Sequence, residues 1–167
     1  MRRIAIIGCS GTGKTRLANA LGAKLELPVV HLDREFWQPG WVEPDKVDWA
    51  ERVRELVSGD AWVTDGDFTG TYDIRLPEAD TIVFLEASPV VCTLRVLRRW
   101  IRWRGRVRPD LAAGCWEQFD LKFLRYIWGY RHTRRPAALA RIDALRAGRR
   151  VEVLGSKREV ARFLESV

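Results

Sequence analysis

A glycine-rich phosphate loop stands at the very start of the chain. Residues 8–15 read GCSGTGKT, a complete match to the pattern G-x-x-x-x-G-K-[ST], and the apolar residues 4–7 precede them. Residues 14–25 then repeat leucine and alanine on one helical face. A strand, this loop and a helix in that order form the context that gives the motif its meaning. The chain is therefore predicted to fold as an α/β protein whose first turn holds the phosphates of a nucleotide.

The residue types of the loop explain how it would hold phosphate. Glycine adopts backbone conformations that side chains block, so successive N–H groups can turn inward around the β- and γ-phosphates. Lys14 brings a mobile cation to the same oxygens, and the Thr15 hydroxyl can bind Mg²⁺. The predicted nucleotide contacts in the loop are Gly8, Ser10, Gly11, Thr12, Gly13, Lys14 and Thr15. ATP and Mg²⁺ are the expected cofactors.

Length and composition point to a single domain. The 167 residues suffice for one well-buried core, and a hydrophobic content of 47% argues against disorder. No apolar stretch approaches the length of a membrane span, and the apolar run behind Met1 is too short for a signal peptide. The three cysteines lack a paired metal spacing, which fits a reducing compartment. We expect one domain, residues 1–167, in a cytoplasmic monomer or dimer without membrane contact.

Five apolar runs are predicted as strands, and helical patterns separate them. The strands are expected at residues 3–7, 29–32, 61–64, 81–85 and 150–154. The helices are expected at residues 14–25, 46–57, 116–130, 137–147 and 157–166, and from Pro89 onward. Strict alternation of strands and helices predicts a parallel sheet covered on both faces, which is a three-layer architecture.

Three acidic residues follow predicted strands, at the edge where ligands gather in open parallel sheets. Asp33 ends the second strand, Asp65 the third and Glu86 the fourth. Asp65 is the candidate to hold Mg²⁺, because phosphoryl transfer requires a metal fixed against Thr15 and the phosphates. Asp33 is the candidate to bind the phosphoryl acceptor and to take its proton. Each could instead be a turn aspartate or a helix cap, and this alternative is favoured for Glu86.

Arginines are concentrated in one segment of a chain whose net charge is +7. Between Thr93 and Trp116 lie seven arginines and a single acid, Asp110. The helix predicted to begin at Pro89 has an inward apolar stripe made of Val90, Leu94, Leu97 and Ile101. Four arginines fall on the opposite helical face, namely Arg95, Arg98, Arg99 and Arg102. Such a segment suits a solvated helix face or a nucleic-acid patch as well as a catalytic role.

A lid is the catalytic interpretation of this segment. Glycine and proline interrupt the helix after Arg102, as a hinge would require. Arginines brought over the phosphates would neutralise the charge that develops in phosphoryl transfer and would exclude water. The predicted ATP contacts of the lid are Arg98 and Arg102, and its predicted catalytic residues are Arg104 and Arg108. Arg131, in the next long helix, is predicted to complete this clamp at the substrate.

Aromatic residues follow the second predicted strand. Trp37 and Trp41 flank a Pro-Gly turn and are candidates to line an acceptor pocket. Tryptophans beside a proline turn also pack under loops, so both roles stay open at this point. His31 lies inside an apolar strand and is interpreted as a hydrogen-bonded core residue.

Motifs along nearly the whole chain resemble those of one group of proteins. They are HLD at residues 31–33, PGW at 39–41, DGDFTGT at 65–71 followed by Arg75, and RGRVRPD at 104–110. With these motifs and the phosphate loop, the chain resembles the P-loop kinases, a group that includes adenylate, shikimate and gluconate kinases. Within this group it is most similar to the small bacterial proteins labelled DNA topology modulation proteins.

The resemblance implies a P-loop NTPase fold with the sheet order 2-3-1-4-5 and a helical lid. It also implies an acceptor-binding region at about residues 33–57 and a lid at about residues 98–115. Adenine would lie near the loop after the last strand, where Ser156 and Lys157 are the candidate contacts.

The chain departs from this family pattern at two positions. Thr69 stands where adenylate kinases have the arginine that grips a monophosphate, so Arg75 is the candidate substitute at the substrate. Asp67 stands where relatives usually have asparagine, and it adds negative charge beside Asp65.

These observations together predict an ATP-dependent kinase. It would transfer the γ-phosphoryl group of Mg-ATP to a nucleotide-like or other small acceptor. The alternative is an ATP-binding regulator of DNA topology, whose basic segment contacts the phosphate backbone of a nucleic acid and which has no dedicated acceptor.

Overall fold

Five parallel strands form the central sheet of the computed structural model, which describes residues 1–167. They are β1 (Arg3–Gly8), β2 (Val29–His31), β3 (Trp62–Asp65), β4 (Thr81–Leu85) and β5 (Arg150–Leu154). Their order across the sheet is β2-β3-β1-β4-β5, and every neighbouring pair is parallel. The predicted α/β fold and its sheet order 2-3-1-4-5 are confirmed.

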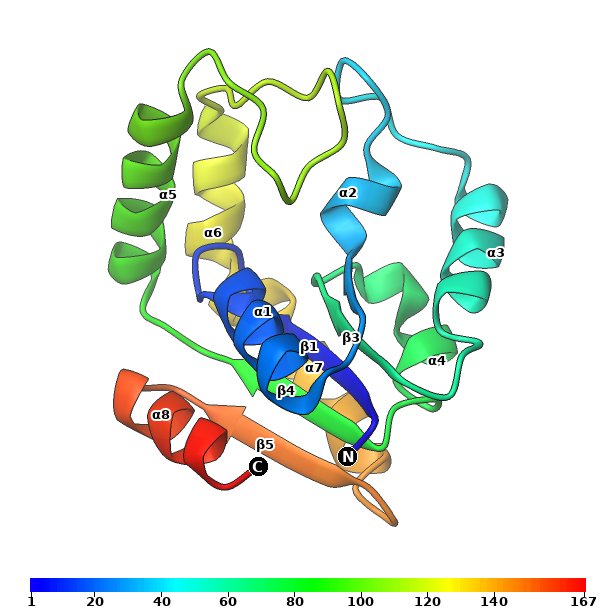
Figure 1. Ribbon diagram of the computed structural model, residues 1–167. Helices are drawn as coiled ribbons and strands as arrows, with labels where there is room; N and C mark the ends of the chain where they lie inside the picture. The colour runs from blue at the N-terminus through cyan, green and yellow to red at the C-terminus, as the bar shows by residue number, and fades with distance from the viewer.

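Helices cover both faces of this sheet. They are α1 (Lys14–Leu25), α2 (Leu32–Phe36), α3 (Lys46–Leu56), α4 (Tyr72–Arg75), α5 (Pro89–Trp103), α6 (Leu121–Thr133), α7 (Arg135–Ala144) and α8 (Lys157–Glu165), with a 3-10 turn η1 (Thr69–Thr71) before α4. Figure 1 shows α1 and α8 in front of the sheet and α7 behind it. The result is the three-layer arrangement that the alternation of strands and helices predicts.

The central strand β1 takes part in both hydrophobic cores. Ile4 and Ile6 pack with α1 and α8 in one cluster of 10 buried residues. Ala5 and Ile7 pack in a cluster of 16 buried residues on the other face. Successive side chains of a strand point to opposite faces, so this alternation anchors β1 from both sides. The loop that follows β1 is therefore held on a rigid support.

Helix α5 is rotated about its axis relative to the sequence-based prediction. The predicted inward stripe is largely exposed, at Val90, Leu94 and Ile101. Cys92 and Val96 are buried in its place. The physical reason is a close backbone contact, because a Cβ at Gly11 would lie 2.7 Å from the carbonyl oxygen of Cys92. This contact sets the helical phase, and it turns Arg95 and Arg99 toward the phosphate loop.

Two further boundaries differ from the prediction. Helix α6 begins at Leu121, after the N-cap Asp120, whereas the sequence pattern predicted a start at Trp116. Trp116 instead forms an isolated bridge with Val107, a contact that no local pattern encodes. Strand β2 ends at His31, so Asp33 lies in the first turn of α2 and not at the end of a strand.

Two irregular segments, residues 37–45 and 104–120, contact each other beyond the carboxyl ends of the strands. In Figure 1 the segment between α5 and α6 arches from α5 toward α2. The backbone N–H of Gly40 donates to the carbonyl oxygen of Gly114 at 3.1 Å. The Trp41 indole N–H donates to the carbonyl oxygen of Trp116 at 2.9 Å. These bonds join the two segments that the family resemblance marks as acceptor region and lid.

Candidate functional site

The phosphate loop has the backbone shape that its sequence motif requires. Gly11 has a φ of 84° and Gly13 a φ of 107°, in the left-handed region that glycine tolerates and other residues rarely adopt. Helix α1 begins directly afterwards at Lys14. The loop thus closes between β1 and α1, and the positive end of the α1 dipole faces it.

Cations of the protein bind the carbonyl groups of this loop, while several of its N–H groups stay free. Lys14 Nζ donates to the carbonyl oxygens of residues 8 and 9 at 2.8 and 3.0 Å. Arg95 Nη1 donates to those of residues 11 and 12, both at 3.0 Å. Within residues 8–15, only the N–H groups of Gly8 and Thr12 have a hydrogen-bond acceptor in the protein, and the other six are free. Unpaired N–H groups at a helix N-terminus form an anion-binding site.

Thr15 and Asp65 bring two oxygen ligands together beside the loop. Thr15 Oγ1 donates to Asp65 Oδ2 at 2.7 Å. Hydroxyl and carboxylate oxygens suit Mg²⁺, which usually takes one or two protein ligands and completes its shell with phosphate oxygens and water. The donor set therefore fits a magnesium ion that also binds a nucleotide.

His31 holds the second oxygen of this carboxylate. Its Nδ1 lies 2.5 Å from Asp65 Oδ1, and the two residues are direct register partners across β2 and β3. The hydrogen bond with Asp65 raises the pKa of His31. His31 was interpreted from the sequence as hydrogen-bonded, but Asp65 was not identified as its partner. This partner could have been predicted, because His31 and Asp65 end neighbouring parallel strands.

Asp67 is surrounded by hydrogen-bond donors. The hydroxyl groups of Tyr72 and Tyr130 donate to Oδ1 at 2.7 and 2.8 Å, and that of Tyr126 donates to Oδ2 at 3.2 Å. The backbone N–H of Gly8 donates to Oδ1 at 3.3 Å. Burial, reinforced by the Asp67 charge, raises the pKa of all three tyrosines, so they remain donors. The carboxylate is thereby stabilised, and it connects α4 and α6 to the phosphate loop.

A cavity of about 670 Å³ opens above the phosphate loop. Ser10 and Lys14 of the loop line it, as does Asp33. Six aromatic side chains line it as well, namely Phe36, Trp37, Trp41, Phe68, Phe123 and Tyr126. The rings of Trp37 and Trp41 lie 5.2 Å apart, edge to face. The two tryptophans therefore stand in a cavity wall, which was one of the two roles that the sequence left open.

Asp33 is a carboxylate of this cavity without a partner in the protein. Its side chain accepts no hydrogen bond from the protein, and it lines the same space as Lys14. Burial raises the pKa of Asp33, and the nearby charge of Lys14 opposes that effect only in part. A carboxylate made more basic by burial is suited to accept a proton from a hydroxyl group.

Arg99 and Arg108 are the arginines of the α5 segment that reach the large cavity. Both face one buried acid, Glu117, which bridges them. Arg99 Nε donates to Glu117 Oε1 at 2.9 Å, and Arg108 Nε lies 3.0 Å from Glu117 Oε2. A further acid, Asp110, lies 3.5 Å from Arg108 Nη1. The sequence pattern places Arg99 in the basic segment but predicts no site role for it. Only the folded chain shows that its side chain faces the cavity.

The structure corrects the places predicted for Arg98, Arg102 and Arg104. All three are exposed and line neither of the two cavities beside the loop. Arg102 shares a helical face with Arg95 but lies in the last turn of α5, two turns beyond the residue that binds the loop.

The structure also corrects the role predicted for Arg75. This side chain is fully buried and lines neither cavity. Its Nη2 donates to the carbonyl oxygens of Gly66 and Asp67 at 2.7 and 2.5 Å. Burial lowers the pKa of Arg75. Its guanidinium therefore braces the turn after β3 and is not available to a substrate.

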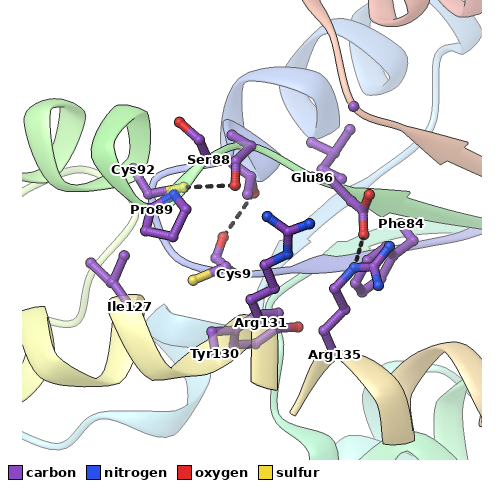
Figure 2. A pocket seen from close by; sticks show the side chains of 14 residues that line it. Cys9, Phe84, Glu86, Ser88, Pro89, Cys92, Ile127, Tyr130, Arg131 and Arg135 are labelled. Carbon is purple, nitrogen blue, oxygen red and sulfur yellow. Dashed lines mark hydrogen bonds and ion pairs between the residues drawn. The ribbon is translucent and has the colours of Figure 1, made fainter. Parts of the chain in front are cut away.

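A second cavity, of about 260 Å³, contacts the phosphate loop at Cys9 and Thr12. Figure 2 shows the Arg131 side chain extending between Cys9 and Glu86, while Arg135 binds Glu86. Arg131 lines this cavity and not the large one, which corrects its predicted place at the acceptor.

The loop after β5 reaches the same small cavity through Gly155. Ser156 caps α8 in a reciprocal capping box with Glu159, and Lys157 is exposed. Neither Ser156 nor Lys157 lines a cavity, although both directly follow Gly155.

Comparison with solved structures shows which proteins share this fold. The chain is similar to a gluconokinase from Sinorhizobium meliloti 1021, with a TM-score of 0.52 and 18% identity over 99% of this chain and 94% of that one. It is similar to a sugar kinase from Janibacter sp. HTCC2649, with a TM-score of 0.54 and 17% identity over 99% and 93%. A shikimate kinase from Acinetobacter baumannii, in complex with shikimate, has a TM-score of 0.52 and 15% identity over 99% and 90%. At these identities the likeness shows the fold.

No family model matches the chain, and no curated protein matches it in sequence. None of its helices combines the length and the apolar character that crossing a membrane would need.

Proposed function

We propose that the protein is a phosphotransferase that moves the γ-phosphoryl group of ATP to a small acceptor in the large cavity. One observation carries the proposal: Lys14 of the phosphate loop and the free carboxylate of Asp33 line the same cavity. A group transfer needs a phosphate site and a proton acceptor on opposite sides of one enclosed space. The shared fold of a gluconokinase and a shikimate kinase supports the same proposal.

In this proposal the phosphate loop and Lys14 hold the β- and γ-phosphates. Thr15 and Asp65 would hold Mg²⁺, which would neutralise charge on the phosphate oxygens when bound. His31 orients the Asp65 carboxylate through their hydrogen bond. Arg95 keeps the loop carbonyls turned away from the phosphates, because it binds two of them.

The acceptor reacts on the far side of the γ-phosphoryl group. Its hydroxyl oxygen attacks phosphorus, the bond from phosphorus to the β,γ-bridging oxygen breaks, and ADP leaves. Asp33 orients the hydroxyl and takes its proton, which the raised pKa of this carboxyl favours. Arg99 and Arg108 stabilise the charge that spreads over the transferring group.

The expected acceptor region and the expected lid have different roles in this proposal. We assign residues 33–57 to acceptor binding and residues 98–115 to the lid of the single domain 1–167. Closing the lid excludes water that would otherwise hydrolyse ATP. The adenosine end of ATP is assigned to the Gly155 side of the loop, beside Ser156 and Lys157, because Gly155 and Thr12 line one cavity.

A second function rests on the arginines that face solvent. Arg98, Arg102, Arg104 and Arg106 are exposed at the end of α5 and just beyond it. Such a patch could hold the phosphate backbone of a nucleic acid, as a regulator of DNA topology would need. Binding of this kind weakens steeply as salt rises and shows no sequence preference. Substituting Arg98 and Arg102 by alanine would then abolish DNA retention.

Mg²⁺-dependent release of ADP tests the proposed transferase. The wild type and Lys14→Ala are compared with ATP alone and with a panel of nucleosides, nucleoside monophosphates and sugar or cyclitol acids. We expect one acceptor class to stimulate release, and the variant to lose about 100-fold or more of it. Lys24→Ala, which changes an exposed lysine in the last turn of α1 outside both cavities, is the matched control. Release that is slow and identical across the panel would contradict a dedicated acceptor site.

A further inference from the structure

The large cavity is lined by aromatic side chains as well as by charged ones. Four of the six aromatic residues form one contiguous group, in which the Phe36 ring is centred 4.8 Å from those of Trp37 and Phe68, and the Trp41 ring lies 5.2 Å from that of Trp37. The Phe123 and Tyr126 rings lie nearly parallel, with an interplanar angle of 19°. Such surfaces bind flat rings by stacking and edge contacts.

Most cationic side chains that line the cavity already interact with other groups of this chain. Arg99 and Arg108 both face the Glu117 carboxylate, and Arg108 also approaches Asp110. Arg134 donates to the Thr69 hydroxyl at 3.3 Å, and its guanidinium lies 5.3 Å from the centre of the Tyr126 ring. Lys14 serves the phosphates of ATP. Lys122, an exposed side chain at the start of α6, is the remaining cation.

Two carboxylates of the same cavity have no partner in the protein. Asp33 and Glu43 line it, and neither forms an ion pair or a side-chain hydrogen bond. Asp67 and Asp120 line it without an ion pair as well, but both accept hydrogen bonds from the protein. A phosphate or carboxylate on the acceptor would meet the charges of Asp33 and Glu43.

Arg75 cannot balance these two charges, because it is fully buried, lines neither cavity and is bound to backbone carbonyls. The buried arginine that does line the cavity, Arg108, is already paired with Glu117 and Asp110. Hydroxyl groups, by contrast, donate hydrogen bonds to free carboxylates.

We propose that the acceptor is an uncharged nucleoside. Its planar base lies against the aromatic wall, and its sugar hydroxyl points to Asp33 and the phosphate loop. This inference rests on the proposed transferase function and names the acceptor of that site. The reaction joins the nucleoside hydroxyl oxygen to the γ-phosphorus and breaks the bond from phosphorus to the bridging oxygen. The products are a nucleoside monophosphate, ADP and one proton.

Quenching of tryptophan fluorescence tests binding separately from catalysis. Trp37 and Trp41 lie in the cavity wall, so a stacked base should quench their emission. The intact protein is titrated, with a non-hydrolysable ATP analogue and Mg²⁺ present, with adenosine, guanosine, cytidine and thymidine. Each titration is repeated with the matching 5′-monophosphate, and with gluconate and shikimate. We expect one nucleoside to bind at least about tenfold more tightly than its monophosphate, because the added charge faces Asp33 and Glu43.

Two variants assign the binding to this wall. Trp37→Ala should weaken binding of that nucleoside about fivefold, the effect of one lost aromatic contact. Trp128→Ala, which removes a 54% exposed tryptophan outside the cavity, should leave the affinity unchanged. Circular dichroism spectra of both variants show whether the fold is intact.

The outcomes separate the two proposals. No binding by any nucleoside, or tighter binding by the monophosphates or the sugar acids, would overturn the nucleoside assignment while leaving a transferase possible. Nucleoside binding lost in Trp37→Ala, together with its phosphorylation by ATP, would support both. Nucleoside binding without any phosphoryl transfer would support the acceptor class and overturn the transferase function.

Discussion

The phosphate loop and the acceptor cavity meet at Lys14, yet they are assembled in different ways. Within the loop, the bonds of Thr12 and Lys14 to its carbonyls join residues three to six positions apart. Around the cavity, the hydrogen bond from Tyr130 to Asp67 spans 63 positions, and that from Trp41 to the Trp116 carbonyl spans 75. The first region is a local structure, and the second exists only when distant elements dock.

This difference indicates which region provides phosphate binding and which provides specificity for the acceptor. A local loop keeps its shape on any scaffold that supplies a strand and a helix, so its chemistry is general phosphate binding. A cavity built from long-range contacts depends on the side chains of this chain, so specificity is expected to reside there. Four experiments, each with a pair of variants, probe the comparison from the largest expected effect to the smallest.

The proposed metal ligand, Asp65, lies where the local loop meets the sheet. Asp65→Asn removes a carboxylate charge beside Thr15 and should raise the Mg²⁺ concentration for half-maximal ATP turnover about 100-fold. His31→Gln, which leaves the carboxylate in place, should raise it about tenfold, because the Asp65 carboxylate loses its orienting partner. Mg²⁺ titrations of ADP release measure both. Equal effects of the two variants would contradict the assigned roles.

The Asp67 network tests how far the loop depends on distant elements. Asp67→Asn removes the charge that three tyrosine hydroxyls and one backbone N–H face, and should lower the free energy of unfolding by about 2 kcal/mol. Tyr126→Phe removes the longest of these hydroxyl bonds and should lower it by about 1 kcal/mol. Urea unfolding monitored by tryptophan fluorescence gives both values. A stability equal to that of the wild type in Asp67→Asn would show that the loop stands without this network.

Arg95 and Arg98 form a matched pair on one helix. Arg95→Ala removes two hydrogen bonds to loop carbonyls and should raise the KM for ATP about tenfold. Arg98→Ala removes an equal charge from the exposed face and should leave the KM unchanged. Steady-state kinetics with varied ATP distinguish them. A similar rise in both variants would mean that only net charge matters.

The pH dependence of turnover probes Asp33. Only the ionised carboxylate can take the acceptor proton, so kcat/KM should fall as pH drops through the pKa of Asp33. Burial raises that pKa, so the fall should begin at a higher pH than for an ordinary aspartate. Profiles of Asp33→Glu and Asp33→Asn provide the check. The first should keep an acid limb at reduced rate, and persistence of the same limb in the second would assign it to another group.

Most of the fold could be predicted from the sequence. The strands β1 and β4 are largely apolar runs, which are readable because strands buried on both faces carry no polar face. The edge strand β5 is less apolar, because it carries Arg150 and Glu152. Helix α5 was located by its Ser88-Pro89 start, but its orientation was not, because most of its apolar stripe is exposed while Arg95 binds the phosphate loop. The amphipathic pattern was misleading there, since a charged active-site edge reverses the usual rule that apolar residues face inward.

The amino-acid sequence alone determined the phosphate loop, the parallel α/β sheet and the positions of Asp65 and Asp33 near the carboxyl ends of the strands. These features depend on residue type and on spacings of a few residues, which a sequence displays directly. Only the tertiary structure decided that Arg95 and Arg99 face the loop, that Arg75 braces a turn and that six aromatic residues enclose the acceptor space. Those outcomes follow from backbone contacts such as that of Gly11 with Cys92, across 81 positions of the chain, and no local pattern encodes them.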